Sequence, residues 1–168
     1  LITSWYRDGT TVHDITFPEN MIQVAYYDSY SGSGNGFDGC WGTYPFLPSG
    51  NIISSDRNSG PGGSGRLLIY GRAFQQASFL SGRVVDSLTG SPISGANVEI
   101  VTSSMTTTNL LGNYTLGSVN SGVFQLIFSA TGYIPVTFNV SLQIGYMTSL
   151  ADVALLPGIV VPGCTDPL

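Results

Sequence analysis

Residues able to carry out acid–base or nucleophilic chemistry are scarce in this sequence. His13 is the only histidine among 168 residues, so one chain cannot build a histidine-rich metal site, and a Ser-His-Asp triad would have to use His13. The G-x-S-x-G pattern of a nucleophile elbow is absent. His13 lies in the run TVHDIT at 11–16, whose composition is typical of a β-strand. We therefore interpret His13 as an ordinary strand residue and predict no catalytic residue.

Two glycine-rich runs have the G-x-G-x-x-G spacing of a dinucleotide-binding motif. They are Gly34–Gly39 and Gly60–Gly65, but no helical pattern follows either, and the motif binds phosphates only where it joins a strand to a helix. Asp28 and Asp38 are candidates for a loop calcium site, although the regular spacing of a calcium loop is missing and solvated loop acids are the favoured interpretation. The sequence therefore predicts no cofactor and no metal.

Three residues bear on covalent modification. Cys40 and Cys164 have no metal-binding spacing, and they are either free, paired with each other or paired with another chain. Asp86-Ser87-Leu88 resembles the Asp-Ser/Thr-apolar pattern at which some bacteria attach O-glycans. Because Ser87 falls in a predicted hairpin turn, it is a candidate glycosylation site, with an unmodified turn serine as the alternative.

Charge is scarce and excludes one class of partner. Five basic residues, all arginine, stand against ten acidic ones, which gives a net charge of −5. Phosphate binding needs a basic surface, so we predict no nucleic-acid partner. Charged residues form 9% of the sequence, against about 25% in an ordinary soluble domain, so the surface opposes self-association only weakly. No apolar run approaches the roughly 20 residues of a membrane helix, and no membrane insertion is predicted.

The elements that position these residues are predicted to be β-strands throughout. Apolar residues alternate or form short runs, and no stretch keeps helical spacing for three turns. The sequence pattern changes near residue 77, where we place a domain boundary. The chain starts at Leu1 without a signal peptide, so we expect a processed or partial segment of a longer precursor. The predicted domains are 1–77 and 78–156, followed by an extended arm at 157–168. Predicted strands cover 1–7, 11–15, 22–27, 40–46, 51–55, 66–70, 80–86, 96–102, 112–116, 122–130, 134–142 and 148–155.

The second half carries a family resemblance. SGRVVDSLTGSPISGANVEI from Ser81, followed by TTTNLLGNYTLGSVNSGVFQLIFSATGYIPVTFNVSL, resembles the carboxypeptidase regulatory-like domain. The resemblance implies an immunoglobulin-like, seven-stranded antiparallel β-sandwich over about 81–156, without catalytic residues, that serves as a spacer, stalk or adhesion module. Ten of its residues are expected to be largely buried: Val84, Val98, Ile100, Tyr114, Leu116, Leu126, Phe128, Val136, Phe138 and Val140.

The first half carries a second resemblance. YRDGTTVHDIT at 6–16 and FDGCWGTYPFLPSGNIISSD at 37–56 resemble the C-terminal part of choice-of-anchor B proteins, a family of secreted bacterial proteins. This implies an antiparallel, propeller-blade-like sheet region over 1–77. GCTDPL at 163–168 is similar to the opening of a repeat found in exported extracellular proteins.

Together these features predict a secreted, non-enzymatic, all-β protein at the cell surface or outside the cell. The leading hypothesis is a structural subunit of a homopolymeric filament, whose partners are copies of itself joined by β-strand addition. The alternative is an adhesin or carbohydrate-binding module that uses the aromatic first half, with glycans as partners. The candidate inter-subunit strand residues are Leu1, Ile2, Thr3, Ser4 and Trp5 at one end and Ile159, Val160 and Val161 at the other.

Overall fold

The computed structural model describes residues 1–33, 36–57 and 61–158. The chain divides into two compact units, Leu1–Gln76 and Ala77–Leu168. Within the described residues both units consist of β-strands and loops, with one short 3-10 turn at Pro61–Gly63. The all-β fold class predicted from the sequence is confirmed.

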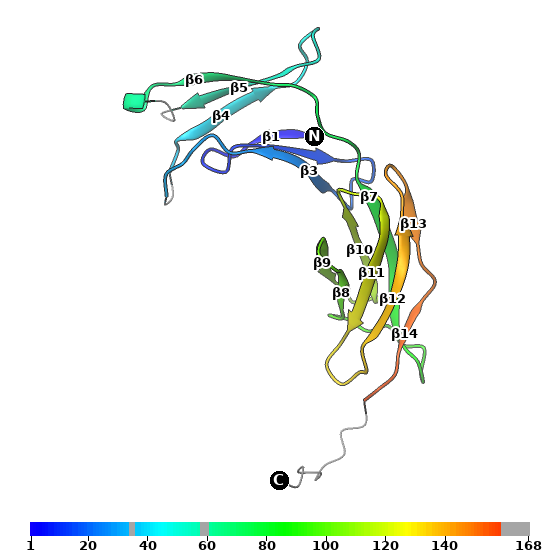
Figure 1. Ribbon diagram of the computed structural model, residues 1–168. Coiled ribbons are helices and arrows are strands. Elements are labelled where there is room, and N and C mark those ends of the chain that lie inside the picture. Colours follow the sequence, from blue (N-terminus) through cyan, green and yellow to red (C-terminus); the bar gives the residue numbers. More distant parts are fainter. Residues whose placement is uncertain (34–35, 58–60, 159–168) are drawn as a thin grey trace. The chain divides into compact units, whose positions relative to one another are not determined.

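The first unit contains two three-stranded antiparallel sheets, each with its strands in chain order (Figure 1). One sheet is β1 (Ile2–Ser4), β2 (Thr10–Asp14) and β3 (Ile22–Tyr27), and the other is β4 (Gly39–Tyr44), β5 (Ile52–Arg57) and β6 (Arg66–Tyr70). The propeller-blade-like arrangement of this region stays a prediction.

A single bridge joins the two sheets of the first unit. The Tyr6 backbone N–H donates to the Cys40 carbonyl at 2.9 Å, and the Cys40 N–H donates back to the Tyr6 carbonyl at 2.8 Å. Gly39 precedes the bridge with φ 83°, and a Cβ there would collide with the Tyr6 carbonyl. Glycine is therefore required at 39 for the strands to approach this closely.

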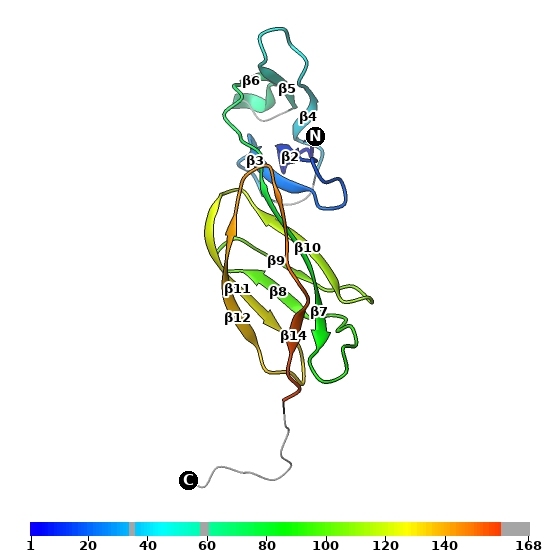
Figure 2. The ribbon, with the colours of Figure 1, turned by 90° about the vertical axis from the view of Figure 1, so that its right-hand side faces the viewer.

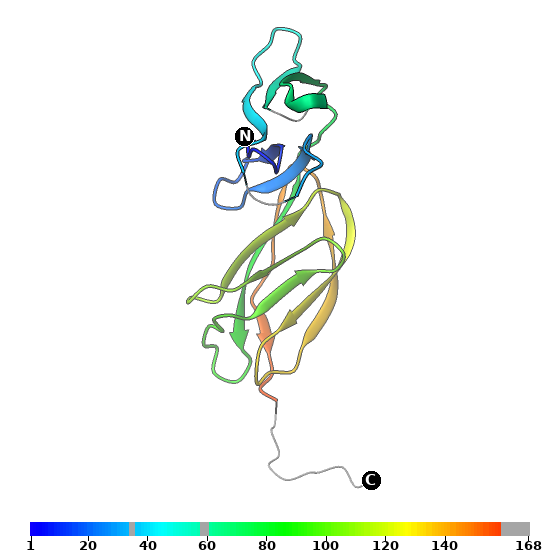
Figure 3. The ribbon, with the colours of Figure 1, turned by 90° about the vertical axis from the view of Figure 1, so that its left-hand side faces the viewer.

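The second unit is a two-layer sandwich, which Figures 2 and 3 show from opposite sides. One sheet has the order β10-β7-β13, with β14 also paired to β7, and the other has the order β12-β11-β8-β9. With β13 and β14 taken as one interrupted strand, seven strands are described. Their bounds are β7 (Ser78–Asp86), β8 (Asn97–Ile100), β9 (Ser104–Thr107), β10 (Asn113–Ser118), β11 (Gly122–Ser129), β12 (Val136–Leu142), β13 (Met147–Ser149) and β14 (Val153–Leu155).

The last segment of the sandwich differs from the expected antiparallel strand at 148–155. Both β13 and β14 pair parallel to β7, with Met147 opposite Phe79 and Val153 opposite Val84. The chain can take this direction because it crosses from β12 in one sheet to β7 in the other. Between the two paired stretches β7 has residues 82 and 83, whereas the other side has residues 150 to 152. The extra residue interrupts the ladder and divides the strand.

The strand expected at 96–102 ends earlier, at Ile100, and a further strand was missed. Thr102 has φ 64°, and the Ser103 N–H donates to the Ile100 carbonyl at 2.9 Å, so the chain turns and returns as β9. The sequence of β9, SMTT, has one large apolar residue. A strand this polar gives no hydrophobic alternation to detect.

The core of the sandwich agrees largely with the expected set. Val84, Val98, Ile100, Tyr114, Leu116, Leu126 and Phe128 are buried. Val136, Phe138 and Val140 are only partly buried and pack against this core. The difference arises because all three lie on β12, which is an edge strand of its sheet.

Candidate functional site

Two outer strands of the first unit have no further strand beside them in the part of the chain that the structure describes. β3 is an outer strand of one sheet and β6 is an outer strand of the other, whereas the opposite outer strands, β1 and β4, contact each other. Neither strand contains lysine, and the sequence of β3, IQVAYY, has no charge at all. Leu67 and Ile69 on β6 are each 64% exposed. Edge lysines and bulges normally prevent pairing with another strand. β3 has a register shift where it pairs with Val12 and His13, whereas β6 pairs with β5 in unbroken register. The apolar edge of β6 therefore offers its backbone groups to another strand.

An apolar groove of about 320 Å³ involves both of these edges. The Tyr27 ring on β3 and the Tyr70 ring on β6 contact each other, with centroids 5.4 Å apart. No charged side chain lines the groove. The lining residues are Thr10, Val12, Ala25, Tyr26, Tyr27, Ile52, Tyr70, Gly71, Ala73 and Phe74.

A second groove, of about 540 Å³, shares Val12 and Phe74 with the first but is more polar. It is lined in part by His13, Asp14 and Arg72. The Asp14 carboxylate accepts hydrogen bonds from the Thr16 hydroxyl at 2.6 Å and the Thr16 backbone N–H at 2.9 Å. Asp14 therefore stabilises the turn that follows β2. His13 lies within β2, so we still interpret it as a strand residue.

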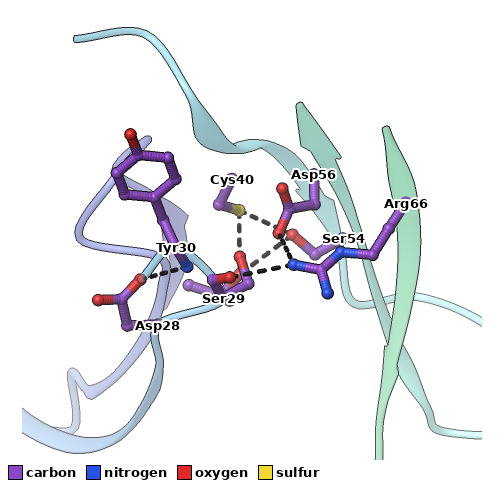
Figure 4. Close-up of polar contacts among 8 residues, drawn as sticks. Asp28, Ser29, Tyr30, Cys40, Ser54, Asp56 and Arg66 are labelled. Carbon is purple, nitrogen blue, oxygen red and sulfur yellow. Dashed lines mark hydrogen bonds and ion pairs between the residues drawn. The ribbon is translucent and has the colours of Figure 1, made fainter. Parts of the chain in front are cut away.

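A buried polar cluster links the two sheets of the first unit (Figure 4). The Cys40 thiol lies 2.7 Å from the Ser54 hydroxyl and 3.0 Å from the Thr10 hydroxyl, and the two hydroxyls are 3.1 Å apart. Thr10 comes from β2, Cys40 from β4 and Ser54 from β5, so the cluster connects one sheet to the other. The Tyr70 hydroxyl is also buried beside it, and burial raises the pKa of this group, while the Thr10 and Ser54 hydroxyls partly oppose the rise.

Asp56 adds a buried carboxylate to the same region. Its side chain is fully buried, and the nearest cation is the Arg66 guanidinium at 3.7 Å, whose own side chain is 40% exposed. Arg66 also donates to the Ser29 carbonyl at 3.0 Å, as Figure 4 shows. Neither Asp56 carboxylate oxygen accepts a hydrogen bond from a described residue. The ion pair is therefore what compensates the buried charge.

The geometry of this cluster favours a structural role over a chemical one. Cys40 is 1% exposed, so reagents and substrates have no access to its thiol. Among the described residues, no three His, Cys, Asp or Glu side chains come together as they would around a metal. The cluster connects the sheets beneath the apolar groove.

Exposed aromatic rings form a separate surface on the first unit. Tyr6 contacts Phe37 edge to face at 5.1 Å and Trp41 at 5.6 Å. The Arg57 guanidinium lies 5.6 Å from the Trp41 ring centre. Trp41 is 57% exposed. An exposed aromatic ring next to a guanidinium is the kind of surface on which a sugar can stack.

The two loop acids considered for calcium are engaged otherwise. Asp28 accepts a hydrogen bond from the Tyr30 backbone N–H at 2.8 Å, which is a turn contact. Asp38 forms a 2.6 Å ion pair with Arg7. A cation already neutralises Asp38, so its environment does not favour calcium.

The candidate strand and modification residues are placed as follows. Ile2–Ser4 form β1, which pairs with β2, and the Trp5 indole N–H donates to the Thr3 hydroxyl at 2.7 Å. The Leu1 amino group donates to the His13 carbonyl at 2.8 Å. Ile159, Val160 and Val161, like Cys164, lie outside the described residues. Ser87 is exposed in the turn after β7, where the Asp86 carboxylate accepts N–H groups of Leu88 and Thr89 at 2.8 and 2.9 Å.

Sequence reasoning missed the groove and the polar cluster. One signal was available in β5, where Ile52, Ser54 and Asp56 alternate with exposed or half-buried residues and are all buried. That alternation indicates a polar inner face. Nothing in the sequence indicates that Thr10 and Cys40 meet it.

Comparison with known proteins identifies the second unit. Residues 80–156 match the family model described as the carboxypeptidase regulatory-like domain, which confirms that resemblance. The match points to a non-enzymatic, structural protein, and the observed sandwich is consistent with an immunoglobulin-like fold. The resemblance of the first half to choice-of-anchor B proteins stays a prediction. The sequence matches no curated protein.

Two solved structures show distant similarity. GBS52, the minor pilin of the gram-positive pathogen Streptococcus agalactiae, is 16% identical with a TM-score of 0.39, over 74% of this chain and 66% of that one. The group B streptococcus pilus 2b backbone protein is 15% identical with a TM-score of 0.40, over 70% of this chain and 53% of that one. Similarity of this degree does not establish a shared function. Among the described residues no helix has the length and apolar character to cross a membrane.

Proposed function

We propose that this protein is a structural subunit of an extracellular or cell-surface assembly, and that copies of it polymerise by β-strand addition. The observation that carries the proposal is the lysine-free outer strand β6 in the first unit, which pairs with β5 in unbroken register and has no described strand on its other side. Backbone hydrogen bonds along an edge supply affinity, and alternate side chains of the added strand supply specificity. A heterologous contact of this type need not close into a ring, so its repetition gives a filament.

The two candidate donors are not equivalent. Leu1–Trp5 already pairs with β2 through β1, so it could be donated only after leaving its own sheet. The segment Ile159–Val161 follows the sandwich and is uncharged. Donation of the N-terminal segment would break its pairing with β2, so the C-terminal segment is the preferred donor.

The experiment combines electron microscopy with sedimentation velocity over a concentration series of the full chain. Wild-type protein should form filaments, and Ile69→Lys on β6 should suppress them, because an edge lysine opposes strand pairing. Val123→Lys is the matched control, since Val123 is exposed but lies on β11, which has neighbours on both sides. A wild-type chain that stays monomeric at every concentration would refute the proposal.

A second candidate function is carbohydrate binding on the rings of Tyr6, Phe37 and Trp41, which the exposure of Trp41 and Phe37 favours. A glycan array tests it directly. Saturable binding that is lost in Trp41→Ala, with filament formation unchanged, would support an adhesin in place of a pure scaffold. Attachment of a glycan to the exposed Ser87 hydroxyl is a further proposal, and intact-mass measurement of secreted protein against a Ser87→Ala variant tests it.

A further inference from the structure

The groove that involves β3 and β6 has the character of a strand-binding site. Apart from Thr10 and Gly71, the residues that line it are apolar or aromatic, and none carries a charge. An uncharged strand can enter it without desolvating an ion, whereas a charged segment would lose hydration with no partner in the lining. The groove therefore selects an apolar, uncharged occupant.

The first unit also has little core of its own. Among its described large apolar side chains, Val12 and Ile52 are buried, and both line this groove. Tyr26 and Tyr27, which line it as well, are 70% and 52% exposed. A strand laid in the groove would cover the exposed rings and extend the small core, which is the usual reason for a contiguous apolar surface to exist.

One segment of the chain has the matching composition. Ile159-Val160-Val161 is uncharged, β-branched and bounded by Pro157 and Pro162. β-branched residues favour an extended conformation. Three residues extend about 10 Å, which equals the length of the three consecutive β3 residues, Ala25, Tyr26 and Tyr27, that line the groove. The segment is thus short enough to lie along the part of β3 that lines the groove.

Connectivity of the sandwich shows where the chain enters and leaves the second unit. The chain enters at Ser78, the first residue of β7, directly after the first unit. It leaves beside the other end of β7, because Leu155 lies opposite Asp86 and the Gly158 N–H donates to the Gly132 carbonyl at 2.7 Å. β7 contains nine residues, which is about 30 Å. The three residues after Gly158 span at most about 11 Å, so they cannot return along the length of β7.

We propose that this groove, lined by β3 and β6, binds Ile159–Val161 of a second copy of the chain, an inference that rests on the polymerisation proposed above. Each subunit then presents an acceptor in its first unit and a donor after the last strand of its sandwich. Because donor and acceptor are different surfaces, every added subunit leaves one of each free.

The acceptor is tested by filling the groove. Ala73 lines it, is exposed and lies outside the strands, so Ala73→Trp should occupy the groove without disturbing a ladder. Ala151→Trp, in an exposed loop of the second unit, is the matched control. We expect Ala73→Trp to raise the concentration for half-maximal assembly at least tenfold and Ala151→Trp to leave it unchanged, with circular dichroism reporting that both variants are folded.

The donor is tested by Val160→Asp, which places a charge in the middle of the segment, with Thr165→Asp as a control that adds the same charge outside it. Val160→Asp should stay monomeric where wild type assembles. Mixing Val160→Asp with Ala73→Trp should give one-to-one pairs and no filaments. The only intact donor belongs to Ala73→Trp and the only intact acceptor to Val160→Asp, so one joint can form and neither free end can extend it. Each variant alone should stay monomeric.

The heterodimer excluded in this mixture is the one of opposite polarity, in which Val160→Asp would supply the strand to Ala73→Trp. The pair of allowed polarity, with the strand coming from Ala73→Trp, is the expected product in sedimentation velocity. Its absence, with both variants folded, would overturn the assignment of donor and acceptor.

A synthetic peptide of residues 157–163, labelled with a fluorophore, separates the remaining outcomes. It should bind monomeric Val160→Asp saturably in fluorescence anisotropy. In the double variant, which carries both Val160→Asp and Ala73→Trp, the peptide should bind at least tenfold more weakly. If wild type forms filaments while Ala73→Trp assembles and binds peptide as before, the groove assignment is wrong and the proposed function survives. If wild type never assembles, the proposed function fails, and peptide binding by such a monomer would overturn a second copy as the occupant.

Discussion

Gly82 and Tyr114 provide the most direct test of the packing in the second unit. The two residues lie opposite each other on β7 and β10, and Tyr114 is 3% exposed. A Cβ at position 82 would lie 2.7 Å from the Tyr114 Cζ and closer still to its hydroxyl oxygen. The ring therefore occupies the space that a side chain at 82 would need.

Gly82→Ala should consequently destabilise the sandwich. Overpacking costs about 1–3 kcal/mol, whereas replacing glycine by alanine inside a strand returns about 0.5–1 kcal/mol. We expect a net loss of about 1–2 kcal/mol in the free energy of unfolding. Tyr114→Ala alone should cost about 3–5 kcal/mol, because it deletes a buried ring. In the Tyr114→Ala background the clash is gone, and Gly82→Ala should then be neutral or slightly stabilising.

The assay is urea unfolding of the four chains of this cycle, followed by circular dichroism, with amide exchange of β7 and β10 as the local readout. The expected coupling energy between positions 82 and 114 is about 1–3 kcal/mol, since contacting residues are not additive. Additive effects of the two substitutions would refute the packing argument.

Three further predictions concern single groups. The Cys40 thiol, 1% exposed, should resist maleimide in native Cys164→Ser protein and react in urea; rapid native labelling would contradict its burial. The hydrogen bond from the Thr89 backbone N–H is the main cause of a lowered Asp86 pKa. The ionised Asp86 carboxylate should therefore stabilise the fold at pH values above its ordinary pKa of 3.8, and this stabilisation should be lost as the pH falls through the lower folded-state pKa. Urea unfolding between pH 2 and 5 should show a weaker pH dependence in Asp86→Asn than in the wild type. Arg66→Ala should destabilise the first unit by about 1–3 kcal/mol, because it leaves the Asp56 carboxylate buried without its cation, and Asp56→Val added to it should recover part of the loss in the same assay.

The sequence predicted strands well where apolar residues alternate between clear turn signals. β3 and β6 have the predicted bounds, 22–27 and 66–70, because each is an apolar run bounded by polar or glycine-rich loops. β9 was missed because its polar sequence carries no alternation. The parallel direction of β13 and β14 was also missed, since the direction of a pairing is set by how the chain crosses between sheets and leaves no local pattern.

The candidate site was less accessible to sequence reasoning. The apolar character of Ile159–Val161 can be recognised from its residues alone, and so can the absence of lysine. The groove cannot be recognised from the sequence, because Ala25, Tyr70 and Phe74 come from separate parts of the chain and meet only after both sheets have formed. The contact of Thr10 with Cys40 depends in the same way on the packing of one sheet against the other.

The two units differ in how much of their apolar surface is buried, and this difference shows where the scarcity of charge matters. The second unit buries a continuous core that includes Leu80, Val98 and Phe128, whereas the buried large apolar side chains described in the first unit are Val12 and Ile52. The first unit leaves Leu67 and Ile69 exposed on an edge strand beside an uncharged groove. A soluble monomer gains nothing from such a surface, because exposed apolar edges invite association. In the proposed assembly an added strand would cover this surface. The absence of lysine is therefore informative chiefly on β3 and on Leu67–Tyr70 of β6, where an edge charge would oppose the proposed pairing. The charged residue of β6, Arg66, is already engaged by Asp56 and the Ser29 carbonyl.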